Sequence, residues 1–172
     1  MKVIGIAGWS GAGKTTLLTR VIPRLTARGL RVSTLKHAHH AFDVDQPGKD
    51  SHTHRVAGAT EVLISSANRF ALMHELRGAP EWTLPALLAK LSPVDLVLVE
   101  GFKRETHPKL EVFRAAVGKP MLHPDDPHIV AVASDGAVAA RVPVVPLDDI
   151  EAVADILLAK AVPLDAARGR NP

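Results

Sequence analysis

Gly8-Trp9-Ser10-Gly11-Ala12-Gly13-Lys14-Thr15 is the stretch that decides the fold of this chain. It fits the pattern G-x-x-x-x-G-K-[ST] of loops that bind phosphate groups. An apolar run over residues 1–7 precedes it and is typical of a buried strand, and residues 16–25 carry apolar side chains at helical spacing. Since the motif needs a strand before it and a helix after it, we expect this loop to bind a nucleoside triphosphate.

The chemistry expected of this loop follows from its composition. Glycines let the backbone turn tightly and aim several N–H groups at one point, where the helix N-terminus adds partial positive charge. Lys14 is placed to reach the β- and γ-phosphates, and the Thr15 hydroxyl to bind Mg²⁺. The alternative is a glycine-rich turn without a ligand, which the flanking strand and helix disfavour. The predicted nucleotide-binding residues of the loop are Gly8, Ser10, Gly11, Ala12, Gly13, Lys14, Thr15 and Thr16.

Length and composition limit the possible classes of protein. The 172 residues suit one nucleotide-binding domain, predicted over residues 1–162, followed by a frayed tail over residues 163–172. The hydrophobic content of 47% suffices for a core, and no apolar run approaches the ~20 residues of a membrane span. The chain has no cysteine, which excludes disulfides and thiolate metal sites and fits a cytoplasmic location.

The charge is mildly basic. The formal net charge is +3, but no tract of Lys and Arg is present, and aromatic residues make up only 3% of the chain. Base stacking needs aromatic side chains, so a nucleic-acid partner is not expected. Small ligands rich in phosphate, or an acidic protein partner, explain the surplus charge better.

The remaining pattern predicts an α/β fold with a mostly parallel, twisted sheet flanked by helices. A helix over residues 13–28 and a strand over residues 31–36 complete a right-handed βαβ unit with the first strand. Residues 61–66 and 69–74 are predicted to form a local antiparallel hairpin. Further strands are expected at 94–100, 129–134 and 143–147, with helices at 51–57, 83–91 and from Asp148 or Asp149 to about Lys160.

A polar loop follows the second strand, where open α/β sheets bind ligands. Five of the nine histidines fall between His37 and His54. One interpretation is a divalent-metal site, whose candidate ligands are His37, His39, His40, Asp43 and Asp45. A second is that Asp43, Asp45, Lys49 and Asp50 meet Mg²⁺ and phosphate while the histidines form hydrogen bonds. A third is an ordinary solvated loop, and the irregular ligand spacing disfavours a structural zinc site.

Glu100 ends the apolar run Val94–Val99 and precedes Gly101. An acid at the end of a central strand is what a nucleotide site needs to hold Mg²⁺ or to orient an attacking water. In the alternative interpretation Glu100 only caps the next element. We therefore expect Lys14 and Glu100 to be the catalytic pair and Thr15 and Glu100 to share the metal.

Asp135 follows another apolar strand. A carboxylate there can accept two hydrogen bonds from N1 and the exocyclic amine of guanine, which adenine cannot donate. The chain lacks Asn-Lys-x-Asp, and the alternative is a turn aspartate before Gly136. Lys103, Lys109 and Arg114 either meet the phosphates of a second ligand or belong to a charged surface loop.

These motifs together resemble the molybdopterin-guanine dinucleotide biosynthesis protein B (MobB) family. The resemblance spans residues 1–135. It rests on the phosphate loop, Lys36-His37-x-His39-His40 with Asp43-x-Asp45, Gly48-Lys49-Asp50-Ser51 with Arg55, Leu98-Val99-Glu100-Gly101-Phe102-Lys103, and Pro108-Lys109-Leu110-Glu111-Val112. Thr53 stands where family members often carry a basic residue.

The resemblance implies a P-loop NTPase fold with an eight-stranded sheet. It further implies a homodimer that binds GTP and Mg²⁺, hydrolyses GTP weakly and assists a separate molybdenum cofactor guanylyltransferase, which attaches GMP to molybdopterin. Molybdopterin or its guanine dinucleotide is then a further candidate ligand, near Gly48–Ser51 and Lys103. Two rival functions stay open, namely a small-molecule kinase and a metal chaperone that uses the histidine-rich loop.

Overall fold

The computed structural model describes residues 1–38 and 42–164, which divide into two compact units. Unit 1 comprises Met1–His37 together with the chain from Leu84 onward, and unit 2 is Ala38–Thr83. The single domain expected over residues 1–162 stays a prediction. Residues 165–172 of the predicted tail lie outside the described residues.

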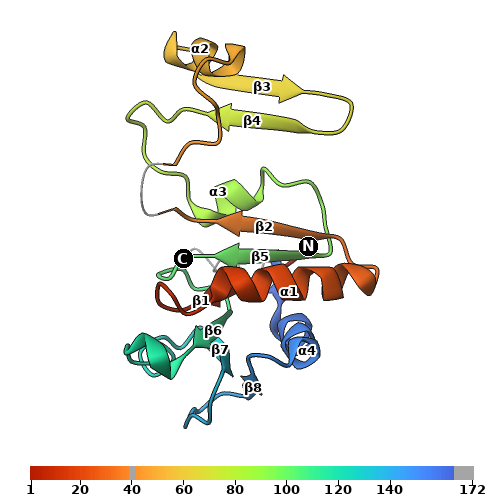
Figure 1. Cartoon of the computed structure of the whole chain (residues 1–172), viewed down its shortest axis with the longest axis vertical. Helices are drawn as coiled ribbons and strands as arrows, with labels where there is room; N and C mark the ends of the chain where they lie inside the picture. The colour runs from red at the N-terminus through yellow and green to blue at the C-terminus, as the bar shows by residue number, and fades with distance from the viewer. Residues whose placement is uncertain (39–41, 165–172) are drawn as a thin grey trace. The chain divides into compact units, whose positions relative to one another are not determined.

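Unit 1 is built on a seven-stranded sheet (Figure 1) with the order β2-β5-β1-β6-β7-β8 and with β9 paired to β1. All neighbours run parallel except β9, which confirms the mostly parallel sheet. The eight-stranded sheet implied by the resemblance is wrong for the described residues. The main sheet has seven strands, and β3 and β4 form a separate two-stranded sheet. The strands are β1 (Lys2–Ala7), β2 (Val32–Lys36), β5 (Leu96–Glu100), β6 (Lys109–Phe113), β7 (Ile129–Ser134), β8 (Val144–Pro146) and β9 (Val162–Pro163).

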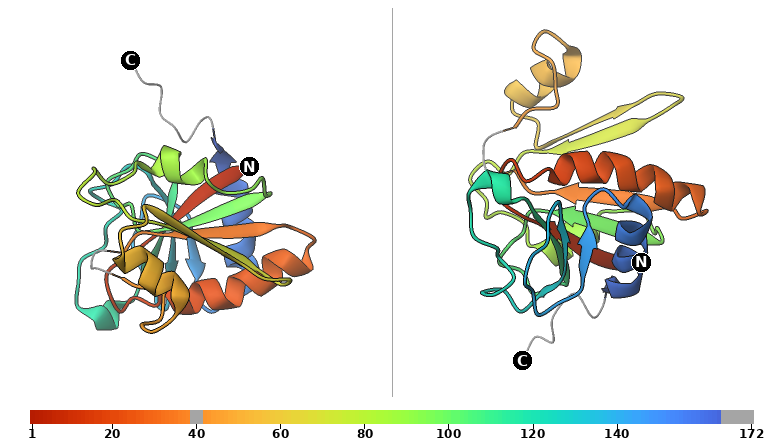
Figure 2. Two further views of the ribbon diagram at one scale, coloured as in Figure 1. Left: turned by 90° about the horizontal axis from the view of Figure 1, so that it is seen from above. Right: turned by 60° about the horizontal axis from the view of Figure 1, so that its bottom comes forward.

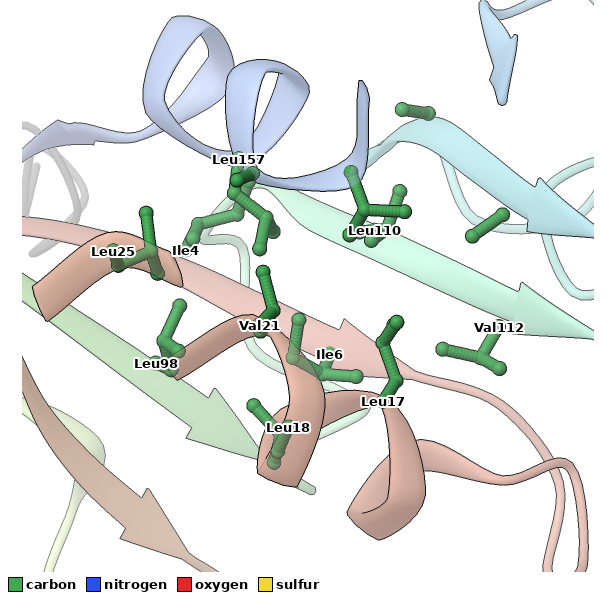
Figure 3. Close-up of a cluster of buried hydrophobic side chains, with 14 of the residues drawn as sticks. Ile4, Ile6, Leu17, Leu18, Val21, Leu25, Leu98, Leu110, Val112 and Leu157 are labelled. Atoms are coloured by element: carbon green, nitrogen blue, oxygen red, sulfur yellow. The ribbon is translucent and has the colours of Figure 1, made fainter. Parts of the chain in front are cut away.

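The two faces of this sheet are covered differently (Figure 2). Helices α1 (Lys14–Ala27) and α4 (Ile150–Lys160) bury one face, and the short helix α3 (Leu84–Leu88) packs on the other. The alternation of strand side chains explains this division. Ile4 and Ile6 join the cluster with α1 and α4 (Figure 3), whereas Val3 joins Leu84 and Leu88. A single-turn 3-10 helix, η1 (Ala115–Val117), follows β6.

The helix boundaries follow the expected signals. Gly29 ends the first helix with a φ of 83° and donates its backbone N–H to Thr26. Asp149 caps α4 through a hydrogen bond of 3.0 Å from the Ala152 N–H to its Oδ1. Exposed ion pairs of Arg20 and Arg28 with acids of the 148–155 segment tie α1 to α4, and such pairs add little stability.

Unit 2 holds α2 (Asp50–Val56) and the antiparallel pair β3 (Glu61–Ser65) and β4 (Phe70–His74), which confirms the predicted hairpin. Lys49 holds the N-cap position of α2. In the first turn, the Ser51 hydroxyl donates a hydrogen bond of 2.8 Å to Asp45 Oδ1. The helix is therefore anchored to the preceding loop by its side chains.

None of the helices within residues 1–38 and 42–164 is long and apolar enough to cross a membrane.

Candidate functional site

The glycine-rich loop connects β1 to α1 in the geometry that phosphate binding needs. Gly8, Gly11 and Gly13 have φ angles of 141°, 81° and 94°, in the region that glycine occupies without strain. A Cβ on Gly8 would lie 2.5 Å from the carbonyl oxygen of Val112. The loop therefore rests directly on the backbone of β6, and only glycine fits there.

A pocket of about 400 Å³ opens over this loop. It brings together most of the predicted loop residues with Glu100, which lies at the carboxyl end of the neighbouring strand β5. Its lining residues are Ser10, Gly11, Gly13, Lys14, Thr15, Thr16, Lys36 and Glu100. Lys36 escaped the sequence analysis as a site residue, although its place at the end of a strand beside the histidine-rich loop was a usable signal.

Lys14 lies folded against its own loop. Its Nζ donates hydrogen bonds of 3.0 Å to the carbonyl oxygens of Gly8 and Trp9. Burial lowers the pKa of Lys14, Glu100 opposes this shift, and the nearby charges of Lys103 and Lys36 lower the pKa further. Lys14 thus lies near two further cations and one carboxylate, a balance that favours a polyanionic ligand.

Glu100 is held at the pocket by the turn that follows it. Its side chain is only 13% exposed, and the Lys36 Nζ lies 3.8 Å from its carboxylate. A Cβ on Gly101, whose φ is 95°, would lie 2.7 Å from the His37 Cβ. The Phe102 ring packs against the His37 ring, with 4.6 Å between the ring centroids. The Glu-Gly-Phe sequence is therefore explained by the close packing of this turn against β2.

Trp9 and Lys103 form a contact beside the loop. The Lys103 Nζ lies 5.0 Å from the centroid of a Trp9 ring, within the range of a cation–π interaction. The Trp9 indole N–H donates a hydrogen bond of 2.8 Å to the Pro120 carbonyl. This contact places the predicted ligand-binding residue Lys103 next to the phosphate loop.

Asp135 is linked to the same loop through Arg114. The Arg114 Nη1 lies 3.1 Å from Asp135 Oδ2, and the Arg114 Nε donates a hydrogen bond of 3.3 Å to the Ala12 carbonyl. From the sequence, Arg114 is expected either to meet the phosphates of a second ligand or to belong to a charged surface loop. Nothing in the sequence signals this connection between residues 12, 114 and 135, because it depends on how β6 and β7 follow β1 in the sheet.

Lys109 fits neither alternative that the sequence left open, a phosphate contact or a charged surface loop. Its side chain is 1% exposed and donates a hydrogen bond of 3.1 Å to Asp126. Lys109 and Glu111 occupy alternate positions of β6, and the loop after this strand covers both. The buried Glu111 carboxylate accepts the backbone N–H groups of Leu122 and His123 at 2.6 and 2.9 Å. Both charges therefore anchor the loop over residues 114–128.

The histidine-rich loop belongs partly to unit 2. A backbone hydrogen bond from Asp45, together with the Arg55 guanidinium 2.6 Å away, holds the pKa of the Asp43 carboxyl low. Asp45 also faces Arg55, at 3.5 Å. In the described ranges no three His, Asp or Glu side chains cluster in a way that suits a metal ion.

His39 and His40, two of the candidate metal ligands, lie outside the described residues. Lys49 and Asp50 are exposed in unit 2. Their nucleotide contacts stay predictions, as do the metal-binding roles of Asp43 and Asp45.

Known adapter proteins resemble this chain over most of its length. The chain is 43% identical to the molybdopterin-guanine dinucleotide biosynthesis adapter protein of Escherichia coli (strain K12), over 91% of each chain. It is 38% identical to the adapter protein of the same name from Haemophilus influenzae, over 90% of this chain and 86% of that one. A crystal structure of molybdopterin-guanine biosynthesis protein B matches with a TM-score of 0.73 and 29% identity, covering 91% of this chain and 98% of the other.

Residues 3–135 match the family described as molybdopterin guanine dinucleotide synthesis protein B, MobB. The matched range contains the phosphate loop, Glu100 and Asp135. The P-loop fold and the resemblance inferred from the sequence are thereby confirmed. The chain belongs to the MobB family.

Proposed function

We propose that this chain is an adapter protein of molybdopterin-guanine dinucleotide biosynthesis that binds Mg-GTP. The names of the relatives from Escherichia coli and Haemophilus influenzae support the pathway. The proposal that the chain binds a nucleotide rests on the pocket that Lys14, Thr15 and Glu100 line together. Lys14 neutralises the β- and γ-phosphates once it leaves the loop carbonyls, and the Thr15 hydroxyl with Glu100 fits Mg²⁺, an oxygen-binding ion.

Guanine is the proposed base, because Arg114 contacts both the phosphate loop and Asp135 and so links this carboxylate to the loop. A carboxylate there can accept hydrogen bonds from guanine. The proposed partner is the molybdenum cofactor guanylyltransferase, with molybdopterin or its guanine dinucleotide as a further ligand. We place this adapter in the cytoplasm. Slow GTP hydrolysis fits the lining of the pocket, since none of the described residues that form it is an arginine able to stabilise the transition state.

Glu100→Gln tests the proposed role of the acid. We expect Mg-GTP to bind with nearly unchanged affinity, because the amide keeps the size of the side chain. Hydrolysis should slow about tenfold or more, since the neutral amide orients and activates the attacking water less well than the carboxylate. Single-turnover phosphate release measures the rate, and isothermal titration measures the affinity.

Asp125→Asn is the matched control, because it removes an exposed carboxylate outside the pocket. It should hydrolyse GTP at the parental rate. Equal rates for Glu100→Gln and the parent would remove Glu100 from the mechanism while leaving the binding proposal intact.

The hairpin of unit 2 supports the proposed homodimer. Leu63 and Leu72 lie opposite each other in the pair, with 62% and 49% of their surfaces exposed, and Phe70 is 70% exposed. A two-stranded sheet with such apolar side chains is marginal by itself. A second copy of this chain offers the same apolar surface and forms a symmetric contact.

Leu63→Asp should therefore convert the dimer into a monomer. Charging the centre of an apolar contact leaves the carboxylate unpaired, so the dimer dissociation constant should rise at least a hundredfold. Light scattering after size-exclusion chromatography measures the mass at micromolar protein. Val144→Asp, at the exposed edge of the main sheet, is the control and should stay dimeric. A parent chain that is monomeric at every concentration would refute the homodimer.

A further inference from the structure

Arg114 lies between the phosphate loop and Asp135, and the proposed function gives it no role of its own. It comes directly after β6, and its side chain is about one-third exposed. The guanidinium makes two contacts at once, since Nε donates to the Ala12 carbonyl and Nη1 lies 3.1 Å from Asp135 Oδ2. A planar fork of fixed geometry suits such a double contact, which a lysine ammonium cannot reproduce.

The direction of the Arg114 side chain separates two possible tasks. The pocket over the loop is lined by Lys14 and Lys36, and Arg114 is not among its lining residues. A Cβ on Gly13 would lie 3.3 Å from the Arg114 Nε, so the guanidinium packs against the backbone of the loop. Arg114 is therefore directed at the loop and at Asp135, and the phosphate pocket gets its positive charge from the lysines.

Asp135 has acceptor capacity left in this arrangement. A carboxylate offers about four lone-pair sites on two oxygens, and Arg114 uses Oδ2. The carboxylate can thus keep its contact with Arg114 while it accepts hydrogen bonds from guanine N1 and the exocyclic amine. Its 30% exposed side chain would otherwise rotate freely at the end of β7.

We propose that Arg114 is a positioning residue for guanine recognition, which clamps the Asp135 carboxylate to the phosphate loop so that it reads the base. This inference rests on the proposed binding of GTP. Arg114 then acts through Asp135 and does not touch the phosphates. Its removal should damage selection of the base more than binding of the triphosphate.

The test compares GTP with ITP, which lacks only the exocyclic amine of guanine. Isothermal titration with the full chain and Mg²⁺ gives both affinities. The parent should prefer GTP by about tenfold, the effect of one hydrogen bond to a charged acceptor. Arg114→Gln should bring this ratio to about two, mainly through weaker GTP binding. Lys103→Gln, which removes a cation near the loop but leaves Asp135 in place, should weaken both nucleotides equally and keep the ratio.

Arg114→Lys is the second variant, in case the glutamine variant fails to fold. It keeps the charge beside the loop but loses the fork, so it should also lower the ratio. A ratio near ten in both Arg114 variants would overturn the inference while the proposed function stands. A parent that binds GTP and ITP equally would overturn the reading of guanine by Asp135, and the inference with it. Failure of the parent to bind either nucleotide would refute the proposed function itself.

Discussion

Lys14→Ala should abolish the stabilisation of this protein by Mg-GTP. At a ligand concentration one hundred times the parental Kd, the parent should gain about 2.7 kcal/mol in the free energy of unfolding. For a domain of this size that gain raises the melting temperature by about 5–10 °C. A hundredfold loss of affinity in the variant would leave about 0.4 kcal/mol, which is within the scatter of a thermal melt.

The size of this effect follows from the geometry of the loop. Lys14 is the first residue of α1 and directly follows the last glycine of the loop. We therefore expect its Nζ to reach a phosphate bound over the loop without a change in the backbone. The half-buried position that lowers its pKa also keeps water from screening its charge. Without ligand the variant loses only two hydrogen bonds to loop carbonyls, each worth about 1 kcal/mol.

Lys2→Ala is the matched control for this experiment. Lys2 is exposed at the opposite end of β1 and should leave the GTP-induced shift unchanged. The same melts with Mg-ATP test the base, because Asp135 should favour guanine. A full shift in Lys14→Ala would contradict the proposed phosphate contact, and a shift with ATP but not with GTP would contradict the choice of guanine.

The sequence predicted the centre of this site because its parts are local or lie at strand ends. The phosphate loop is one continuous motif, and Glu100 ends an apolar strand that pairs with β1, so both meet at the carboxyl edge of the sheet. The antiparallel hairpin was equally local. Such features depend on periodicity and on turn residues, which a single sequence displays.

The features that escaped the sequence analysis depend on contacts between distant segments. Lys109 begins β6 and Arg114 directly follows this strand. The two look alike in the sequence, yet Arg114 lies against the phosphate loop and Lys109 is buried beside Asp126. Their surroundings differ because side chains alternate between the two faces of the sheet along β6, and the loop after β6 covers Lys109. The antiparallel strand β9 was missed because its two residues carry too little pattern to be recognised.

Leu98→Ala should cost about 3–5 kcal/mol in the free energy of unfolding, as expected when a fully buried leucine leaves a cavity. Leu98 is 0% exposed in β5, a strand that pairs with both β1 and β2, and it belongs to the cluster under α1 (Figure 3). Neighbours in regular sheet and helix cannot collapse into the space that the side chain leaves. This loss is a large part of the 5–15 kcal/mol typical of a whole domain.

Urea unfolding followed by circular dichroism measures this loss, with Val56→Ala as the control. Val56 is 71% exposed at the end of α2, so its truncation should change stability by less than about 0.5 kcal/mol. Because Leu98 lies two residues before Glu100 but outside the pocket, the folded fraction of Leu98→Ala should still bind Mg-GTP. A loss below about 1 kcal/mol would mean that the β5 core is looser than its packing indicates. Complete loss of binding in the folded variant would mean that the pocket depends on the exact position of β5.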